Sequence, residues 1–219
     1  TNETVKCNFD RGRRFDVDVM DDLETAGLAF GRLSAQFIRD KVVPELDAFR
    51  FASYCGISGV TKKEETLADG AATVTALSAA VTAMDDEEVT ATGRYLFITP
   101  TLLQGINDMD TTKSKKVLEG FEQVIKVPQR RFYTAIKQLS GKTGEEAGGY
   151  TKATGAANIN FAIVQKDALI QYTKHAAPKI IAPENNPDAD AYVFGYRMVG
   201  IAKAYKNMLS GMYFSHDKA

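Results

Sequence analysis

The sequence is poor in the residues on which metal sites, disulfide frameworks and catalytic centres most often depend. Among 219 residues it has two histidines, no tryptophan and two cysteines, and these two, Cys7 and Cys55, form no Cys-x-x-Cys pair. That spacing excludes a zinc ribbon and a disulfide framework, and it predicts two free thiols in a reducing compartment. No apolar run approaches the roughly 18 residues of a membrane span, and no basic and apolar leader indicates export.

The sequence also lacks an excess of either charge. Lysine and arginine total 27 against 28 aspartate and glutamate residues, a formal net charge of -1. Such a chain has no global attraction to nucleic acid or anionic lipid, which leaves only local patches for such contacts. Its 44% hydrophobic and 25% charged residues are typical of a globular protein and exclude wholesale disorder. The length predicts one ordinary domain or two small ones.

The first twenty residues alternate between apolar and polar positions. The alternation keeps its phase across a charged centre, so it predicts one long strand over residues 5–20, roughly 50 Å in length. Cys7 shares the apolar parity, which favours a packed thiol. A strand this long at the start of the chain needs a partner, so we expect the sequence to be a fragment of a longer protein. The apolar positions are Val5, Cys7, Phe9, Phe15, Val17 and Val19.

A long helix is predicted to follow this strand, over residues 22–54. Asp21 is the expected cap of the free backbone N–H groups, with Glu24 in the reciprocal position three residues on. Apolar residues then recur at three- and four-residue spacing, which is typical of an amphipathic helix. Pro44 should kink this helix, and Gly56 with Gly59 should end it.

The rest of the chain reads as a mixture of shorter helices and strands. A helix is predicted over 70–84 and another from Pro100, with strands at 94–98, 123–127, 131–135 and 159–164. Polar loops are expected at 107–120 and 140–158, and the glycine-rich part at 141–155 should be the most mobile. Near the end, alternation over 192–205 and a turn should return residues 212–214 as a partner strand. The predicted fold class is α+β.

The sequence contains few patterns that indicate catalysis or metal binding. Ser140–Thr143 has the tail of a phosphate-binding loop, but Ile136 stands where that motif needs glycine, so a surface loop is favoured. His175 and His216 lack the spacing of a metal pair. The acidic run at 85–88 lacks calcium-loop spacing and favours a solvated helix end. We therefore predict no catalytic, cofactor-binding or metal-binding residues, and no enzyme activity.

Three arginines in the middle of the predicted N-terminal strand are the candidate binding residues. Arg11, Arg13 and Arg14 flank Gly12 on extended backbone. Guanidinium groups bind phosphate and carboxylate equally well, so two partners stay open. They are a phosphate group or carboxylates of a neighbouring subunit, and we take them as candidate subunit contacts.

Six segments in order along nearly the whole chain carry a resemblance to known proteins: Asn8–Phe15, Asp18–Ala26, Lys41–Arg50, Arg94–Pro100, Val127–Tyr133 and Ile181–Pro187. They resemble the major capsid proteins of tailed bacteriophages and prophages. The resemblance implies the Hong Kong-ninety-seven-like capsid fold, with a peripheral domain containing a long spine helix and an axial domain near the local symmetry axis. It places the peripheral domain at 1–59, the axial domain at 60–190 and strands returning to the peripheral domain at 191–219.

This resemblance implies a structural protein. It implies a major capsid subunit that assembles with itself into pentamers and hexamers of an icosahedral head shell, without a cofactor or a membrane. Scaffolding protein, portal and non-specifically contacted DNA are the implied partners, and the implied location is the virion, assembled in the bacterial cytoplasm. The sequence departs from the family because no N-terminal arm or extended loop precedes the region that matches Val5. Asn207 is only a loose candidate for the crosslinking asparagine of some relatives.

Two other functions stay open from the sequence. A bacterial nanocompartment shell protein, similar to encapsulin, uses the same fold to enclose a cargo enzyme. A small hydrolase with its site within residues 60–190 is a third and less favoured function, because no nucleophile, base and oxyanion-stabilising set is recognisable.

Overall fold

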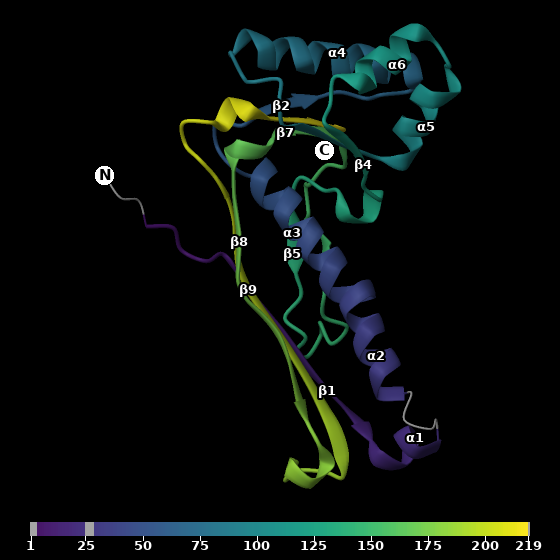
Figure 1. The fold of residues 1–219 in the computed structure, drawn as a ribbon, viewed down its shortest axis with the longest axis vertical. Coiled ribbons are helices and arrows are strands. Elements are labelled where there is room, and N and C mark those ends of the chain that lie inside the picture. The colour runs from purple at the N-terminus through teal and green to yellow at the C-terminus, as the bar shows by residue number, and fades with distance from the viewer. Residues whose placement is uncertain (1–3, 25–28, 219) are drawn as a thin grey trace. The chain divides into compact units, whose positions relative to one another are not determined.

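A computed structural model describes residues 4–24 and 29–218 (Figure 1). The chain divides into two compact units, which we describe separately. Unit 1 contains Thr1–Pro44 and Gln171–Ala202, and unit 2 contains Glu45–Ile170 and Lys203–Ala219. Residues 45–59 and 203–219 lie in unit 2 and residues 171–190 in unit 1, and the peripheral domain at 1–59, the axial domain at 60–190 and the returning strands at 191–219 stay predictions.

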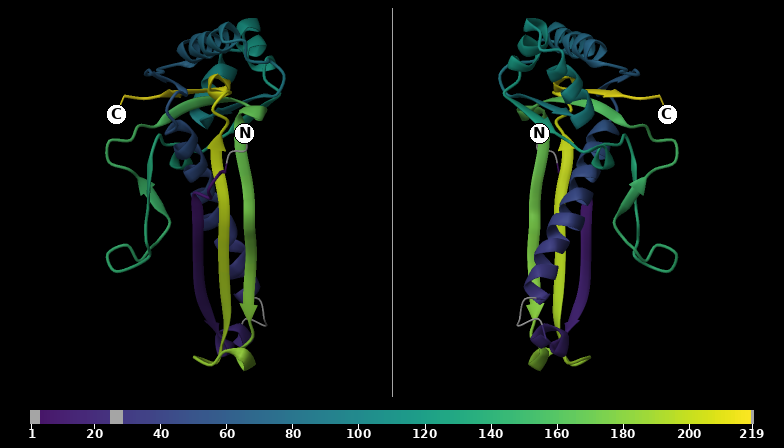
Figure 2. Two further views of the ribbon diagram at one scale, coloured as in Figure 1. Left: turned by 90° about the vertical axis from the view of Figure 1, so that its left-hand side faces the viewer. Right: turned by 90° about the vertical axis from the view of Figure 1, so that its right-hand side faces the viewer.

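Unit 1 is built on a sheet of three long strands in the order β1-β9-β8 (Figure 2). Strand β1 spans Phe9–Asp18, β9 spans Ala191–Ala204 and β8 spans Leu169–Ile181. β1 pairs antiparallel with β9 over its whole length, from Phe9 opposite Gly200 to Asp18 opposite Ala191. β8, which the sequence analysis missed, is an edge strand and contains Pro178, a residue that sheets tolerate at their edges.

The predicted strand over residues 5–20 is confirmed in its centre but is too long at both ends. At one end, the Asn8 side chain takes over the pairing by donating to the Ala202 carbonyl and accepting from the Ala202 N–H, both at 2.9 Å. At the other end, the Asp18 carboxylate accepts the Met20 N–H at 2.8 Å, which starts helix α1. Asp18 is therefore the cap that we assigned to Asp21, and the Glu24 side chain lies outside the described residues.

The predicted long helix is present as three helical segments. They are α1 at Val19–Glu24, α2 at Ala29–Phe37 and α3 at Val43–Cys55, with a π-helical turn at Ile38–Val42 between the last two. In that turn the Val43 N–H reaches the Ile38 carbonyl, five residues back. Pro44 follows this turn directly and has no backbone N–H to donate to a carbonyl of the preceding helical turn. The break that we predicted at Pro44 is therefore present as a widened turn just before it.

Unit 2 contains a five-stranded sheet in the order β2-β10-β7-β3-β4, with helices α4, α5 and α6 packed together on one side of it (Figure 1). The apolar side chains of β3 and β7 meet those of α4 and α5 in one buried cluster. The strands are β2 Thr61–Glu64, β10 Met212–His216, β7 Ile159–Gln165, β3 Arg94–Ile98 and β4 Gln123–Lys126, and the helices are α4 Gly70–Asp86, α5 Pro100–Asp108 and α6 Thr112–Glu119.

Four local predictions for unit 2 are wrong. The expected loop at 107–120 contains α6, which Thr111 and Ser114 start with reciprocal side-chain hydrogen bonds. In place of the expected strand at 131–135, a short helical turn ends at Arg131 and a single bridge joins Tyr133 to Asn158. A two-stranded ribbon follows, with β5 at Ile136–Gln138 and β6 at Tyr150–Lys152, so the expected loop at 140–158 contains a strand. Residues 212–214 pair with β7 and β2, not with the preceding strand β9.

The predicted α+β class is confirmed. Within residues 4–24 and 29–218, no helix has the length and apolar character that crossing a membrane requires. The mobility of residues 141–155 stays a prediction.

Candidate subunit-contact surface

The two faces of β1 have different chemistry because side chains alternate along a strand. Odd-numbered residues, among them Phe9, Phe15 and Val17, share the face on which α2 lies. Phe15 stacks on Phe194 of β9 with ring centroids 4.9 Å apart and meets Phe37 of α2 edge-on at 5.5 Å. This aromatic cluster fixes α2 against the sheet, so it also fixes which face each arginine occupies.

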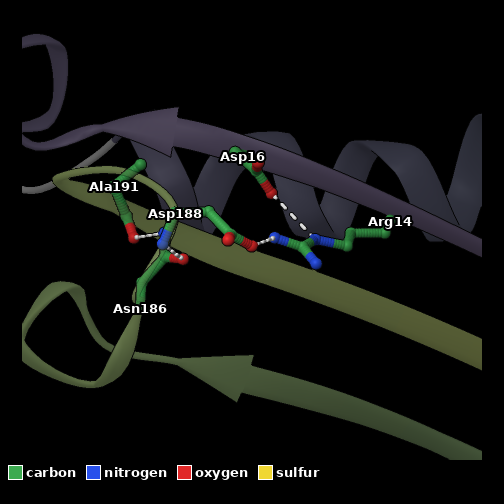
Figure 3. Close-up of polar contacts among 5 residues, drawn as sticks. All are labelled: Arg14, Asp16, Asn186, Asp188 and Ala191. Atoms are coloured by element: carbon green, nitrogen blue, oxygen red, sulfur yellow. Dashed lines mark hydrogen bonds and ion pairs between the residues drawn. The ribbon is translucent and has the colours of Figure 1, made fainter.

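Arg14 lies on the opposite face and is engaged within unit 1 (Figure 3). Its guanidinium group lies 3.4 Å from the Asp16 carboxylate and 3.7 Å from that of Asp188, in the turn between β8 and β9. Asn186 shapes this turn by donating to the Ala191 carbonyl and accepting the Asp188 N–H. All three charged side chains are at least 44% exposed, so these ion pairs contribute little stability but orient the Arg14 side chain toward the turn.

A second ion pair on the same face joins β1 to β9. Arg197 binds Asp10 through two hydrogen bonds of 2.9 and 2.6 Å, and the hydrogen bond from Arg197 lowers the pKa of Asp10. Gly12 stands directly opposite Arg197 in the register, and a Cβ there would lie 3.2 Å from the Tyr196 carbonyl and 3.7 Å from the Arg197 side chain. The absence of a side chain at Gly12 therefore leaves room for Arg197 to reach along β1.

Arg11 and Arg13 lie on the other face, with Phe9 and Phe15. Arg11 is partly buried, and Arg13 is exposed opposite Tyr196. Among the described residues, no carboxylate pairs with Arg13. The structure therefore separates the three candidate arginines into two on the α2 side of the sheet and one on the far side, where Arg14 meets carboxylates of its own chain.

The outer edge of β1 is open within the described part of the chain, because β9 is its only neighbour in the sheet. The Val19 N–H bonds the Asp190 carbonyl at 3.2 Å, which continues the ladder that pairs odd-numbered residues of β1 with β9. Alternation then directs the backbone N–H and C=O groups of Asp10, Gly12, Arg14, Asp16 and Asp18 toward the open edge. Such an edge is a template for an added strand.

The phosphate-loop remnant at 140–143 binds carboxylates of its own chain. The Ser140 N–H donates to Glu145 at 2.7 Å, and the Gly144 N–H donates to Glu146 at 2.8 Å. Lys137 lies 2.6 Å from Glu145. The hydrogen bonds that Lys137 and Ser140 donate to the Glu145 carboxylate lower its pKa to about 2. The Ser140 and Gly144 N–H groups are thus already bonded to carboxylates, which supports the surface-loop interpretation.

The acidic run at 85–88 has a structural partner that sequence reasoning missed. Arg94 is only 2% exposed, and it pairs with Asp85 at 2.7 Å and donates to the Val89 and Thr90 carbonyls. The Asp85 carboxylate therefore compensates the charge of the buried Arg94 guanidinium group. No group of metal-ligating side chains exists among the described residues.

The remaining candidate residues lie apart from one another. Cys7 is exposed, contrary to the packed thiol that we expected, because regular pairing of β1 begins only after it. Cys55 is buried at the end of α3, and burial raises the pKa of its thiol to about 11. His175 is exposed on β8, and His216 ends β10. Asn207 is exposed in the turn after β9, and nothing in the structure tests it as a crosslinking residue.

No family model matches the chain, and no curated protein matches its sequence. Solved structures do match in fold. A protein from Mycobacterium phage Che8 aligns over 95% of this chain and 70% of its own, with a TM-score of 0.60 and 11% identity. The capsid structure of Cyanophage P-SCSP1u covers 100% and 78%, with a TM-score of 0.57 and 14% identity. A virus-like particle from Pyrococcus furiosus covers 94% and 75%, with a TM-score of 0.62 and 9% identity. The chain has the Hong Kong-ninety-seven-like capsid fold, as the sequence resemblance predicted.

Proposed function

We propose that this protein is a major capsid subunit, which assembles with itself into the icosahedral head shell of a tailed phage or prophage. The observation that carries the proposal is the likeness to capsid structures, which extends over 100% of the chain in that of Cyanophage P-SCSP1u and over 96% in that of the Helicobacter pylori bacteriophage KHP30. In this assignment unit 1 corresponds to the peripheral domain and unit 2 to the axial domain.

The arginine strand supplies a specific contact in this proposal. The Arg13 guanidinium group lies exposed beside an open strand edge, where it can reach a carboxylate of the neighbouring subunit while backbone groups pair alongside. Arg11 lies on the same face as Arg13. Arg14 contributes indirectly, because it pairs with Asp188 of the turn between β8 and β9. Replacing Arg13 with Glu should weaken assembly of the complete protein without unfolding it, and undiminished assembly would remove Arg13 from the contact.

Closure of the shell follows from many modest contacts made together on a symmetric lattice. A net charge of -1 suits dense packing of identical subunits, because strong self-repulsion would oppose it. Scaffolding protein and portal are proposed partners in assembly, and packaged DNA is contacted without sequence specificity. The proposed location is the virion, after assembly in the cytoplasm of the bacterial host.

A nanocompartment shell, which uses the same fold, is the second candidate, and it is not favoured over the capsid function. Electron microscopy of particles formed by the complete protein in its native bacterial context distinguishes the two. DNA-filled heads are expected for the capsid function, and cages filled with a protein cargo would favour the nanocompartment. Absence of any particle would contradict both.

A further inference from the structure

The end of unit 1 where α1 meets the turn between β8 and β9 has the composition of an interface. The two large apolar side chains of α1, Met20 and Leu23, are 64% and 67% exposed. The Val19 N–H bonds the Asp190 carbonyl, which holds α1 beside the turn. An exposed apolar centre beside charged groups is the usual anatomy of a protein contact, so we call Met20, Leu23 and the adjoining turn the α1 face.

The border of the α1 face has charge of one sign. Residues 16–23 and 184–190 contain seven carboxylate side chains and no lysine or arginine. Arg14 reaches this region from β1 and pairs with two of these carboxylates, Asp16 at 3.4 Å and Asp188 at 3.7 Å. Glu184 and Asp190 are exposed on the turn. The occupant of the α1 face must therefore bring cations together with some apolar surface.

The ribbon of unit 2, residues 136–152, has the complementary composition. With the adjoining Arg130 and Arg131 it carries five cations against two carboxylates, Glu145 and Glu146. Arg131 pairs with Asp47 of α3 at 3.0 Å and Lys137 pairs with Glu145, so Arg130, Lys142 and Lys152 are the cations without an ion pair in the described part of the chain. The Tyr150 hydroxyl donates to the Arg130 carbonyl at 2.8 Å, which places Arg130 beside the ribbon. Lys142 is exposed, and no carboxylate pairs with it in the described part of the chain.

The ribbon also has little support of its own. It consists of two strands of three residues each, and an isolated pair of strands is only marginally stable in water. Its loop is nevertheless organised, because Glu145 accepts the Ser140 N–H and pairs with Lys137. A short, organised and cationic ribbon is suited to binding a partner through its outer surface.

We propose that the α1 face of one subunit receives the ribbon of a second copy of this chain. Leu23 and Met20 provide the apolar centre, and the turn carboxylates meet Arg130 and Lys142 at the border. The opposite charges steer the two surfaces together and reject a like-charged neighbour, which sets which subunit edges meet. This inference rests on the proposed shell function and specifies one of its contacts.

Charge reversal on each side tests the contact in the complete protein. Glu184→Lys with Asp190→Lys on the turn, or Arg130→Glu with Lys142→Glu beside the ribbon, should each raise the critical concentration for assembly by at least about tenfold. Combining all four substitutions should restore assembly, because the charges are then exchanged. Lys113→Glu with Lys116→Glu on α6 makes the same charge change elsewhere and should leave assembly unchanged. Circular dichroism checks that each variant is folded.

A crosslinking measurement makes the test independent of any variant. Shells assembled from mixed isotope-labelled and unlabelled protein are treated with a carbodiimide, which joins amines to carboxylates that touch. Mass spectrometry should find Lys142 joined to Glu184 or Asp190 of a differently labelled copy. If wild-type shells form but neither this crosslink nor the charge-reversal defect is seen, the inference is wrong and the shell function stands. If no shell forms, both are overturned.

Discussion

Truncation of Phe194 should selectively loosen unit 1. The side chain is only 2% exposed, and its ring lies 4.9 Å from Phe15, 6.2 Å from Phe30 and 6.3 Å from Phe37, centroid to centroid. Phe194→Ala removes the shared member of three ring contacts, one to Phe15 within the sheet and two to Phe30 and Phe37 of α2. Deleting a buried phenylalanine side chain costs about 3–5 kcal/mol, and the lost ring contacts place this site toward the upper end of that range.

Amide hydrogen exchange is the assay that locates this loss. A destabilisation of about 3 kcal/mol lowers protection of β1, β9 and α2 by roughly 100-fold where exchange reports local opening. Val199→Ala, at a half-buried position of β9 on the other face, is the matched control, and about 1 kcal/mol is expected for it. A Phe194→Ala effect no larger than this control, or equal loss of protection in β3 and β7, would refute the aromatic cluster as the support of unit 1.

Three further outcomes are expected. Gly70→Ala should destabilise unit 2 by about 1–3 kcal/mol in urea unfolding, because the new Cβ would lie 2.1 Å from the Gly105 carbonyl oxygen; a neutral result would mean that α4 and α5 separate easily. Thiol titration without reductant should count two free thiols under denaturing conditions and one rapidly reacting thiol, Cys7, in the folded protein, with Cys55 protected by burial; a disulfide would contradict this. Glu145 has a folded pKa of about 2 against an ordinary 4.5, so the order it gives its loop is complete above pH 4.5 and is lost as the pH falls toward 2. The Ser140 amide resonance reports it, and a midpoint near pH 4.5 would show that the contact is absent.

Periodicity in the sequence was enough to locate β1 but not to set its ends. The shared parity of Phe9, Phe15 and Val17 identifies the apolar face of the strand. The ends depend on Asn8 and Asp18, whose short polar side chains replace backbone pairing and start a helix. Polar residues of this kind read equally well as strand positions until their backbone partners are known.

The alternation of side chains along β1 also predicts which of the three arginines share a face. Treating Arg11, Arg13 and Arg14 as one group missed this. Arg11 and Arg13 have the parity of Phe15, and Arg14 has that of Asp16, so their separation onto two faces follows from sequence alone. Their partners do not, because Asp188 lies more than 170 residues away along the chain from Arg14. Long-range ion pairs become visible only when the register of β1 and β9 is known.

The helix and the strand that were not predicted from the sequence both have mostly polar surfaces. Helix α6 has few apolar residues. Its capping pair is Thr111 and Ser114, whereas the usual sequence signal has Glu or Gln three residues after the capping residue. Strand β8 is exposed along much of its length and contains Pro178, which argues against a strand in a sequence-based assignment. β8 is stabilised by pairing with β9, and α6 by packing its few apolar side chains against the helical cluster of unit 2, and neither contact is visible in the local pattern.

The central claim is that this chain builds a closed shell, and one measurement tests it most directly. The complete protein, co-expressed with any scaffolding partner that it needs, is purified by size exclusion and examined by light scattering and cryo-electron microscopy. We predict closed icosahedral particles whose wall density contains both the three-stranded sheet of unit 1 and the five-stranded sheet of unit 2. A protein that stays monomeric, or forms only small open oligomers under these conditions, would contradict the account.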